Sequence, residues 1–205
     1  MGSRKVKVSK IANLADDLAL ALSARSVRIQ APIPGKGLVG IEVPNEKPSV
    51  VSLRDVMHSE SFSKLEGRLR LSLGEDVSAQ AVAADLRAMP HLLIAGATGA
   101  GKSVCVNAII ASLLLQNSPD TLRLILVDPK RVELTQYNGI PHLLAPVIVD
   151  VDRVVPTLRW VTREMDSRYR RFASLGARNI DDYNRRAHKR GESPIPYIAV
   201  LIDEL

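Results

Sequence analysis

The spacing of apolar residues divides the chain into two regions with different predicted architectures. Between residues 11 and 22, apolar side chains recur every three or four positions, which predicts one amphipathic helix capped by Ser9. Two short apolar segments follow at 27–30 and 38–43, and the proline- and glycine-rich loop between them predicts two strands joined by a turn. We therefore expect a small α+β domain over residues 4–66.

The second region begins near Gly67 and has the alternation of strands and helices that is typical of an α/β domain. Residues 69–73 and 79–86 flank a turn and predict a hairpin. Beyond it, apolar runs of strand length alternate with helical segments, which indicates a mainly parallel sheet with helices on both faces. We expect this domain to span residues 67–205. The predicted strands are 92–95, 122–127 and 197–202, and the predicted helices are 103–115 and 156–175.

A glycine-rich segment joins the predicted strand 92–95 to the predicted helix 103–115. It fits the pattern G-x-x-x-x-G-K-[ST], whose glycines let backbone N–H groups turn onto phosphate oxygens while the following helix directs its positive end at the same anion. In this arrangement the Lys102 ammonium reaches the β- and γ-phosphates of ATP, and the Ser103 hydroxyl coordinates Mg²⁺. The pattern therefore predicts an ATP-binding P-loop. The predicted nucleotide-binding residues are Gly96, Ala97, Thr98, Gly99, Ala100, Gly101, Lys102, Ser103 and Val104.

The predicted strand 197–202 ends in two carboxylates, Asp203 and Glu204. Downstream of a P-loop, Asp203 suits the coordination of Mg²⁺, and Glu204 suits a base that polarises an attacking water. A kinase that hands phosphate to a bound substrate has less need of such a base, so the pair favours ATP hydrolysis. We predict that Lys102 and Glu204 are catalytic and that Ser103 and Asp203 are the metal ligands.

Composition narrows the partners of this predicted ATPase. Of 205 residues, 46% are hydrophobic, and the net charge of +6 permits a polyanionic partner without requiring one. Aromatic residues make up only 3%, which argues against single-strand binding by rows of stacked bases. The single cysteine, Cys105, excludes an internal disulfide and favours a cytoplasmic location. No apolar run reaches the ~18 residues of a membrane helix, so we expect no membrane contact.

Several stretches go beyond a generic P-loop. They are MPHLLIAGAT at 89–98, VDPKRVEL at 127–134, GIPHLL at 139–144, and the segment 158–180. With them the chain, from about residue 10 to its end, resembles the motor region of the FtsK/SpoIIIE family of DNA translocases. Residues 33–36 and 43–45 are similar to that family's smaller α domain.

The resemblance implies a hexameric ring of α and RecA-like β domains that threads double-stranded DNA by ATP hydrolysis, in chromosome segregation and cell division. The family's core continues past the acidic pair with further strands and an arginine contributed across the subunit interface. We therefore expect this chain to be a segment truncated after strand 197–202 that hydrolyses almost no ATP by itself. A related motor of a secretion or conjugation system, moving protein or DNA, is the alternative reading.

Two features leave alternatives open. Asp128, Pro129 and Lys130 follow a core strand and could couple nucleotide state to neighbouring subunits, or Asp128 could cap the next turn with Lys130 paired to Glu133. Between residues 159 and 190 there are ten Lys or Arg against four acids, which fits either a solvated helix face or a surface that meets DNA. The predicted buried stripe of this helix consists of Leu158, Val161, Met165, Tyr169 and Phe172.

Overall fold

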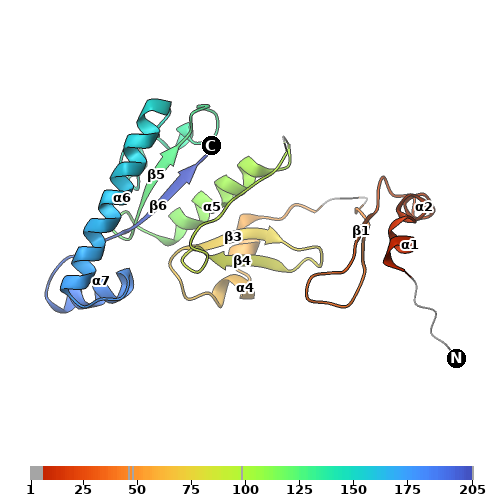
Figure 1. Ribbon diagram of the computed structural model, residues 1–205, viewed down its shortest axis with the longest axis horizontal. Helices are drawn as coiled ribbons and strands as arrows, with labels where there is room; N and C mark the ends of the chain where they lie inside the picture. Colours follow the sequence, from red (N-terminus) through yellow and green to blue (C-terminus); the bar gives the residue numbers. More distant parts are fainter. Residues whose placement is uncertain (1–6, 46, 48, 98, 205) are drawn as a thin grey trace.

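The structure, a computed structural model, describes residues 7–45, 47, 49–97 and 99–204. The last element of the described chain is a strand that pairs in parallel with an earlier strand (Figure 1). In chain order the elements are α1 (Val8–Ala12), α2 (Ala15–Ala21), β1 (Arg28–Gln30), β2 (Gly40–Glu42), α3 (Leu53–Met57), α4 (Glu60–Ser63), β3 (Arg70–Glu75), β4 (Ala81–Asp85), α5 (Lys102–Gln116), β5 (Leu122–Val127), the 3₁₀ turn η1 (Thr135–Tyr137), α6 (Val151–Ser174), α7 (Ile180–Lys189) and β6 (Tyr197–Ile202).

The N-terminal unit contains two short helices where the sequence predicted one. The helix breaks at Asn13, an unfavourable interior residue because its side chain competes for backbone hydrogen bonds. Ser9 lies inside α1, and Lys7 takes the capping position, so the predicted cap is wrong. The predicted strands are confirmed as an antiparallel pair, β1 with β2, in which Ile29 lies opposite Ile41. This unit lies at the end of the molecule away from α6 (Figure 1).

Two short helices connect this unit to the hairpin. Ser52 and Ser59 begin α3 and α4, and their hydroxyl oxygens accept backbone N–H groups at 3.1 and 3.2 Å. Each helix buries one apolar side chain, Val56 and Phe62, and the pair contacts β3, β4 and α5. The predicted hairpin is confirmed as the antiparallel pair β3 and β4. The domain boundary near Gly67 stays a prediction.

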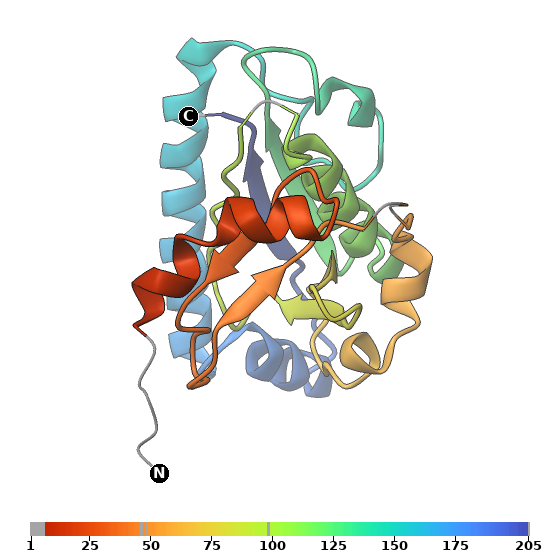
Figure 2. The ribbon, with the colours of Figure 1, turned by 90° about the vertical axis from the view of Figure 1, so that its right-hand side faces the viewer.

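The parallel pair β5 and β6 forms the centre of the C-terminal region. All six residues of β5 pair with β6, from Leu122 opposite Tyr197 to Val127 opposite Ile202. Leu143 and Ile148 bridge to the other edge of β5. Helix α5 lies over one face of the pair and α6 over the other (Figure 2), and each face buries its own apolar cluster. The predicted parallel, two-sided arrangement is therefore confirmed, as are the helices predicted at 103–115 and 156–175.

The strand predicted at 92–95 is wrong. Within the described part of the chain, these residues make no backbone hydrogen bond to a strand, and a run of apolar residues becomes a strand only when it finds such a partner. Leu93 is 88% exposed, whereas Ile94 packs against the cluster beneath α5. The segment still enters the P-loop in front of α5.

The C-terminal helices differ in two ways from the sequence expectation. On α6, Val161 packs against the sheet, but Met165 and Tyr169 of the predicted buried stripe are 48% and 60% exposed, because β5 and β6 cover only part of that stripe. Helix α7 was not predicted, although its signals are local: Asn179 accepts the Asp182 backbone N–H at 2.8 Å, and acidic residues fill the first turn. Among the described residues, no helix is long and apolar enough to span a membrane.

Candidate nucleotide-binding site

The glycine-rich loop has the backbone conformation that a phosphate cradle requires. Gly99 and Gly101 have φ angles of 81° and 92°, a left-handed region in which a side chain is strained. Gly101 is the N-cap of α5, and Lys102 and Ser103 are the first two residues of the helix. The positive end of a 15-residue helix therefore faces the loop. Thr98 lies outside the described residues.

The two predicted motifs meet at this loop. Lys102 Nζ donates to Asp203 Oδ1 at 2.7 Å and to Glu204 Oε1 at 3.4 Å. Asp203 is 5% exposed at the end of β6, and its backbone N–H donates to the Val127 carbonyl at 2.9 Å, which fixes it beside β5. The pKa of Lys102 is raised because its ammonium donates to Asp203, with a smaller effect of Glu204. Residues about a hundred positions apart thus form one charged centre.

The loop after β5 supplies two further contacts to the site. Lys130 pairs with Glu204 Oε2, and the Ser103 hydroxyl donates to Glu133 Oε1 at 2.5 Å. The pKa of Glu204 is lowered first by its hydrogen bond with Lys130 and then by Lys102. Glu204 also has a positive φ of 58°. The pairing of Lys130 with Glu133, which was part of one of the two readings left open, is not what the structure shows, because each of the two contacts a predicted site residue instead.

Asp128 holds this loop in place. Its side chain is fully buried, and Oδ2 accepts the backbone N–H groups of Glu133 and Leu134 at 3.0 and 2.9 Å. Burial acts to raise the pKa of Asp128, but the backbone N–H groups of Leu134, Glu133, Val132 and Arg131 together lower it below its usual value. This confirms the reading of Asp128 as a capping residue.

The predicted nucleotide-binding residues do not all take part in the charged centre. Gly96 and Ala97 are exposed at the start of the loop, and the Ala100 N–H donates to the Ala97 carbonyl at 2.9 Å. Val104 is 73% exposed, and its side chain has no polar atom to offer a phosphate. Lys130 and Glu133 were not predicted as site residues. The adjacency of parallel strand ends could have placed their loop at this edge, but not their partners.

The donor set fits the nucleotide and metal that the sequence predicts. The glycine cradle and the N-terminus of α5 suit phosphate oxygens, while a hydroxyl, Ser103, and a carboxylate, Asp203, are hard oxygen ligands of the kind that Mg²⁺ prefers. Lys102 already joins the loop to the carboxylates.

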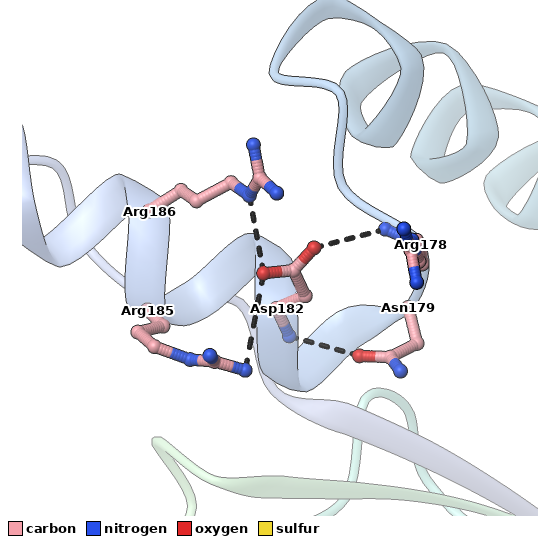
Figure 3. Close-up of a pocket in the computed structure, with 5 residues that line it drawn as sticks. All are labelled: Arg178, Asn179, Asp182, Arg185 and Arg186. Atoms are coloured by element: carbon pink, nitrogen blue, oxygen red, sulfur yellow. Dashed lines mark hydrogen bonds and ion pairs between the residues drawn. The ribbon is translucent and has the colours of Figure 1, made fainter.

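A hollow away from the P-loop lies where α6 turns into α7 (Figure 3). Its lining side chains are Arg178, Asn179, Asp182, Arg185 and Arg186. Asp182 accepts Arg186 Nε at 3.1 Å and the Arg178 backbone N–H at 3.2 Å, and the hydrogen bond with Arg186 lowers its pKa. Part of the basic charge in segment 159–190 is therefore neutralised locally.

Parallel strands with helices on both faces, a glycine loop opening a helix, and an acidic pair at the neighbouring strand end together define a P-loop ATPase. Comparisons with known proteins specify it further. Residues 52–204 match the FtsK/SpoIIIE family and residues 2–45 match the FtsK alpha domain. The chain belongs to the FtsK/SpoIIIE family.

Individual relatives are similar over nearly the whole chain. DNA translocase SpoIIIE of Bacillus subtilis is 51% identical over 206 residues, which cover 98% of this chain and 26% of that protein. DNA translocase FtsK of Caldanaerobacter subterraneus is 53% identical over 203 residues, which cover 99% of this chain and 28% of that protein. The chain therefore spans about a quarter of the length of these relatives.

Solved structures of related motors have the same fold. The conjugation coupling protein TcpA of pCW3, solved with ATPγS, superposes with a TM-score of 0.63 at 25% identity. The matched region covers 98% of this chain and 52% of the TcpA chain. The type VII secretion ATPase EccC of Thermomonospora curvata has a TM-score of 0.61 at 23% identity, covering 76% of this chain and 21% of that protein. These likenesses support the RecA-like α/β fold.

Proposed function

We propose that this chain is the nucleotide-binding part of an ATP-driven motor that translocates double-stranded DNA. The observation that carries the proposal is the charged centre in which Lys102 of the P-loop lies 2.7 Å from Asp203 and 3.4 Å from Glu204. Identity above 50% to proteins named DNA translocases supports DNA as the cargo. The complete motor would act in the cytoplasm as a hexameric ring in chromosome segregation and cell division.

The roles of the site residues follow from their chemistry. Lys102 and the N–H groups at the start of α5 bind the phosphates, and Gly99 and Gly101 allow the backbone to approach them closely. Ser103 and Asp203 would hold Mg²⁺, which neutralises charge on the phosphate oxygens when bound. Glu204 accepts a proton from the attacking water once one of its carboxylate oxygens is free of lysine.

The domain division belongs to the same proposal. We assign residues 4–66 to the smaller α+β domain and residues 67–205 to the ATPase domain. Support comes from the hairpin β3 and β4, which begins at Arg70, three residues after Gly67, and packs against α5. Helices α3 and α4, which this division leaves in the smaller domain, also contact β3, β4 and α5. A side chain at Gly67 would collide with Asp85, since its Cβ would lie 1.9 Å from Oδ2 of that residue.

Binding and hydrolysis test the proposal separately. Calorimetry should detect Mg·ATP binding to the 205-residue chain and its loss in Lys102→Ala, because the charge that faces the phosphates is removed. Lys64→Ala is the matched control, since Lys64 is exposed at the C-cap of α4 and pairs with Glu60. Unchanged affinity in Lys102→Ala would contradict the P-loop assignment.

Cargo is tested in a full-length protein that carries this chain. Duplex DNA should stimulate phosphate release, and the stimulation should weaken with added salt, because lysine and arginine contacts to phosphates release counterions. The fold is shared with TcpA and EccC, so a secretion or conjugation motor is the second candidate. A rate of hydrolysis that duplex DNA does not change would favour a protein cargo.

A further inference from the structure

Both carboxylate oxygens of Glu204 are occupied by lysine. Oε1 accepts Lys102 Nζ at 3.4 Å, and Oε2 pairs with Lys130 Nζ. A general base needs an oxygen within hydrogen-bond reach of the water from which it takes a proton. The residue proposed as the base is therefore held by two lysine side chains.

The two lysines differ in how nucleotide would affect them. Lys102 belongs to the P-loop, so the phosphates of ATP compete directly for its ammonium. Lys130 lies after β5, and its side chain is 61% exposed. Recruiting Lys102 to phosphate would leave the contact of Lys130 with Oε2 intact.

The loop that carries Lys130 also contacts the P-loop. Glu133, three residues further on, accepts the Ser103 hydroxyl at 2.5 Å. Asp128 fixes the end of this loop by accepting the backbone N–H groups of Glu133 and Leu134. One short loop thus joins Ser103, the proposed metal ligand, to Glu204, the proposed base.

We propose that Lys130 is a positioning residue that restrains Glu204 until Mg·ATP binds, and that Glu133 makes this restraint sensitive to Mg·ATP. When Ser103 turns from Glu133 to the metal, the loop 128–134 loses its contact with the P-loop, and Lys130 can release Glu204 to the attacking water. The inference rests on the proposed ATP hydrolysis and on Glu204 as its base. It assigns to Lys130 a restraining role.

The test measures steady-state hydrolysis without DNA in a full-length protein that carries this chain. Lys130→Met should raise the basal kcat about two- to fivefold, a modest change because ion pairs between exposed side chains are weak. The Kd for Mg·ATP should stay within about twofold, since Lys130 pairs with Glu204 and lies outside the P-loop. Lys130→Arg, which keeps the positive charge, should retain the low basal rate of the parent. Lys64→Met is the matched control, an exposed lysine paired with Glu60 on α4.

Two further variants show whether Lys130 acts through Glu204. In the Glu204→Gln background, Lys130→Met should leave the rate unchanged, because a neutral amide has no charge for Lys130 to hold. Glu133→Gln should also raise the basal rate, since it weakens the contact with Ser103. A lower or unaltered kcat in Lys130→Met, or an equal effect in both backgrounds, would overturn the restraint while the ATPase proposal stands. A Glu204→Gln variant as fast as the parent would overturn the restraint and would place the base elsewhere.

Discussion

The carboxylate of Asp128 offers a direct test of how the site is supported. Asp128→Asn keeps the shape of the side chain and removes its charge. In the parent, Oδ2 accepts two backbone N–H groups at 3.0 and 2.9 Å, and Oδ1 is buried without a hydrogen-bond partner among the described atoms. In the variant the amide oxygen accepts the two backbone N–H groups more weakly than the carboxylate does. The amide NH₂ group then takes the position of Oδ1, where it is buried without an acceptor.

The cost can be estimated from these contacts. Hydrogen bonds to a charged group contribute about 1.5–3 kcal/mol, and neutral ones about 0.5–1.5 kcal/mol, so the loss of charge costs about 1 kcal/mol for each of the two bonds. A buried NH₂ group without an acceptor costs about 1–3 kcal/mol more. Relief from burying the carboxylate charge offsets part of this sum. We expect Asp128→Asn to lower the free energy of unfolding by about 2 kcal/mol at pH 7.

Urea denaturation at several pH values measures this quantity, with Asp120→Asn as the control because Asp120 is exposed. The pKa of Asp128 is lower in the folded chain, so its contribution is complete above the unfolded value of about 4 and is lost as the pH falls through the lower folded value. The difference between parent and variant should therefore persist to about pH 4 and shrink below it. Equal stability at pH 7, or a difference that grows in acid, would refute the reasoning.

Three further predictions concern other contacts. Glu204→Gln in a full-length protein should keep ATP binding and slow hydrolysis by about 10²-fold or more, as measured by phosphate release, and turnover within a few-fold of the parent would place the base elsewhere. ATP titrated in EDTA should bind the chain more weakly than Mg·ATP, because Lys102 must leave Asp203 without a metal to replace it. Arg87 donates to Asp85 and Asp181 at 2.8 Å each, so Arg87→Ala should lower stability by about 1 kcal/mol in urea, and an effect no larger than that of Arg153→Ala would contradict this.

Elements whose signals are local were predictable from the sequence. The strand 122–127 is six apolar or amphipathic residues between turns, and its bounds match β5. The helix predicted at 103–115 is α5, extended by one residue at each end. Strand 92–95 failed because strand formation depends on a partner elsewhere in the chain. The predicted burial of Met165 and Tyr169 on α6 was wrong for the same reason, since these side chains are buried only if the sheet extends over them.

The site was predictable in its residue types and less so in its contacts. The P-loop pattern and the acidic pair predicted Lys102, Ser103, Asp203 and Glu204 as site residues, and the structure brings Lys102 into contact with both carboxylates. Nothing in the order VDPKRVEL distinguishes Lys130 paired with Glu133 from Lys130 paired with Glu204. That choice depends on the register of β5 against β6, which places Val127 opposite Ile202 and so brings the following residues together.

Binding of Mg·ATP would require Lys102 and Ser103 to leave their present partners, Asp203 and Glu133, and to contact the phosphates and the metal. Lys102 holds the buried Asp203, and Ser103 holds Glu133, so each group that would contact Mg·ATP already has a partner. When Lys102 turns to phosphate, Asp203 would be left as an uncompensated charge in a site that is 5% exposed, unless a cation takes the place of the ammonium. Mg²⁺ is that cation if Asp203 and Ser103 are its ligands. Metal and nucleotide would therefore bind cooperatively. The phosphates draw Lys102 away from Asp203, and Mg²⁺ supplies the positive charge that the buried carboxylate then lacks.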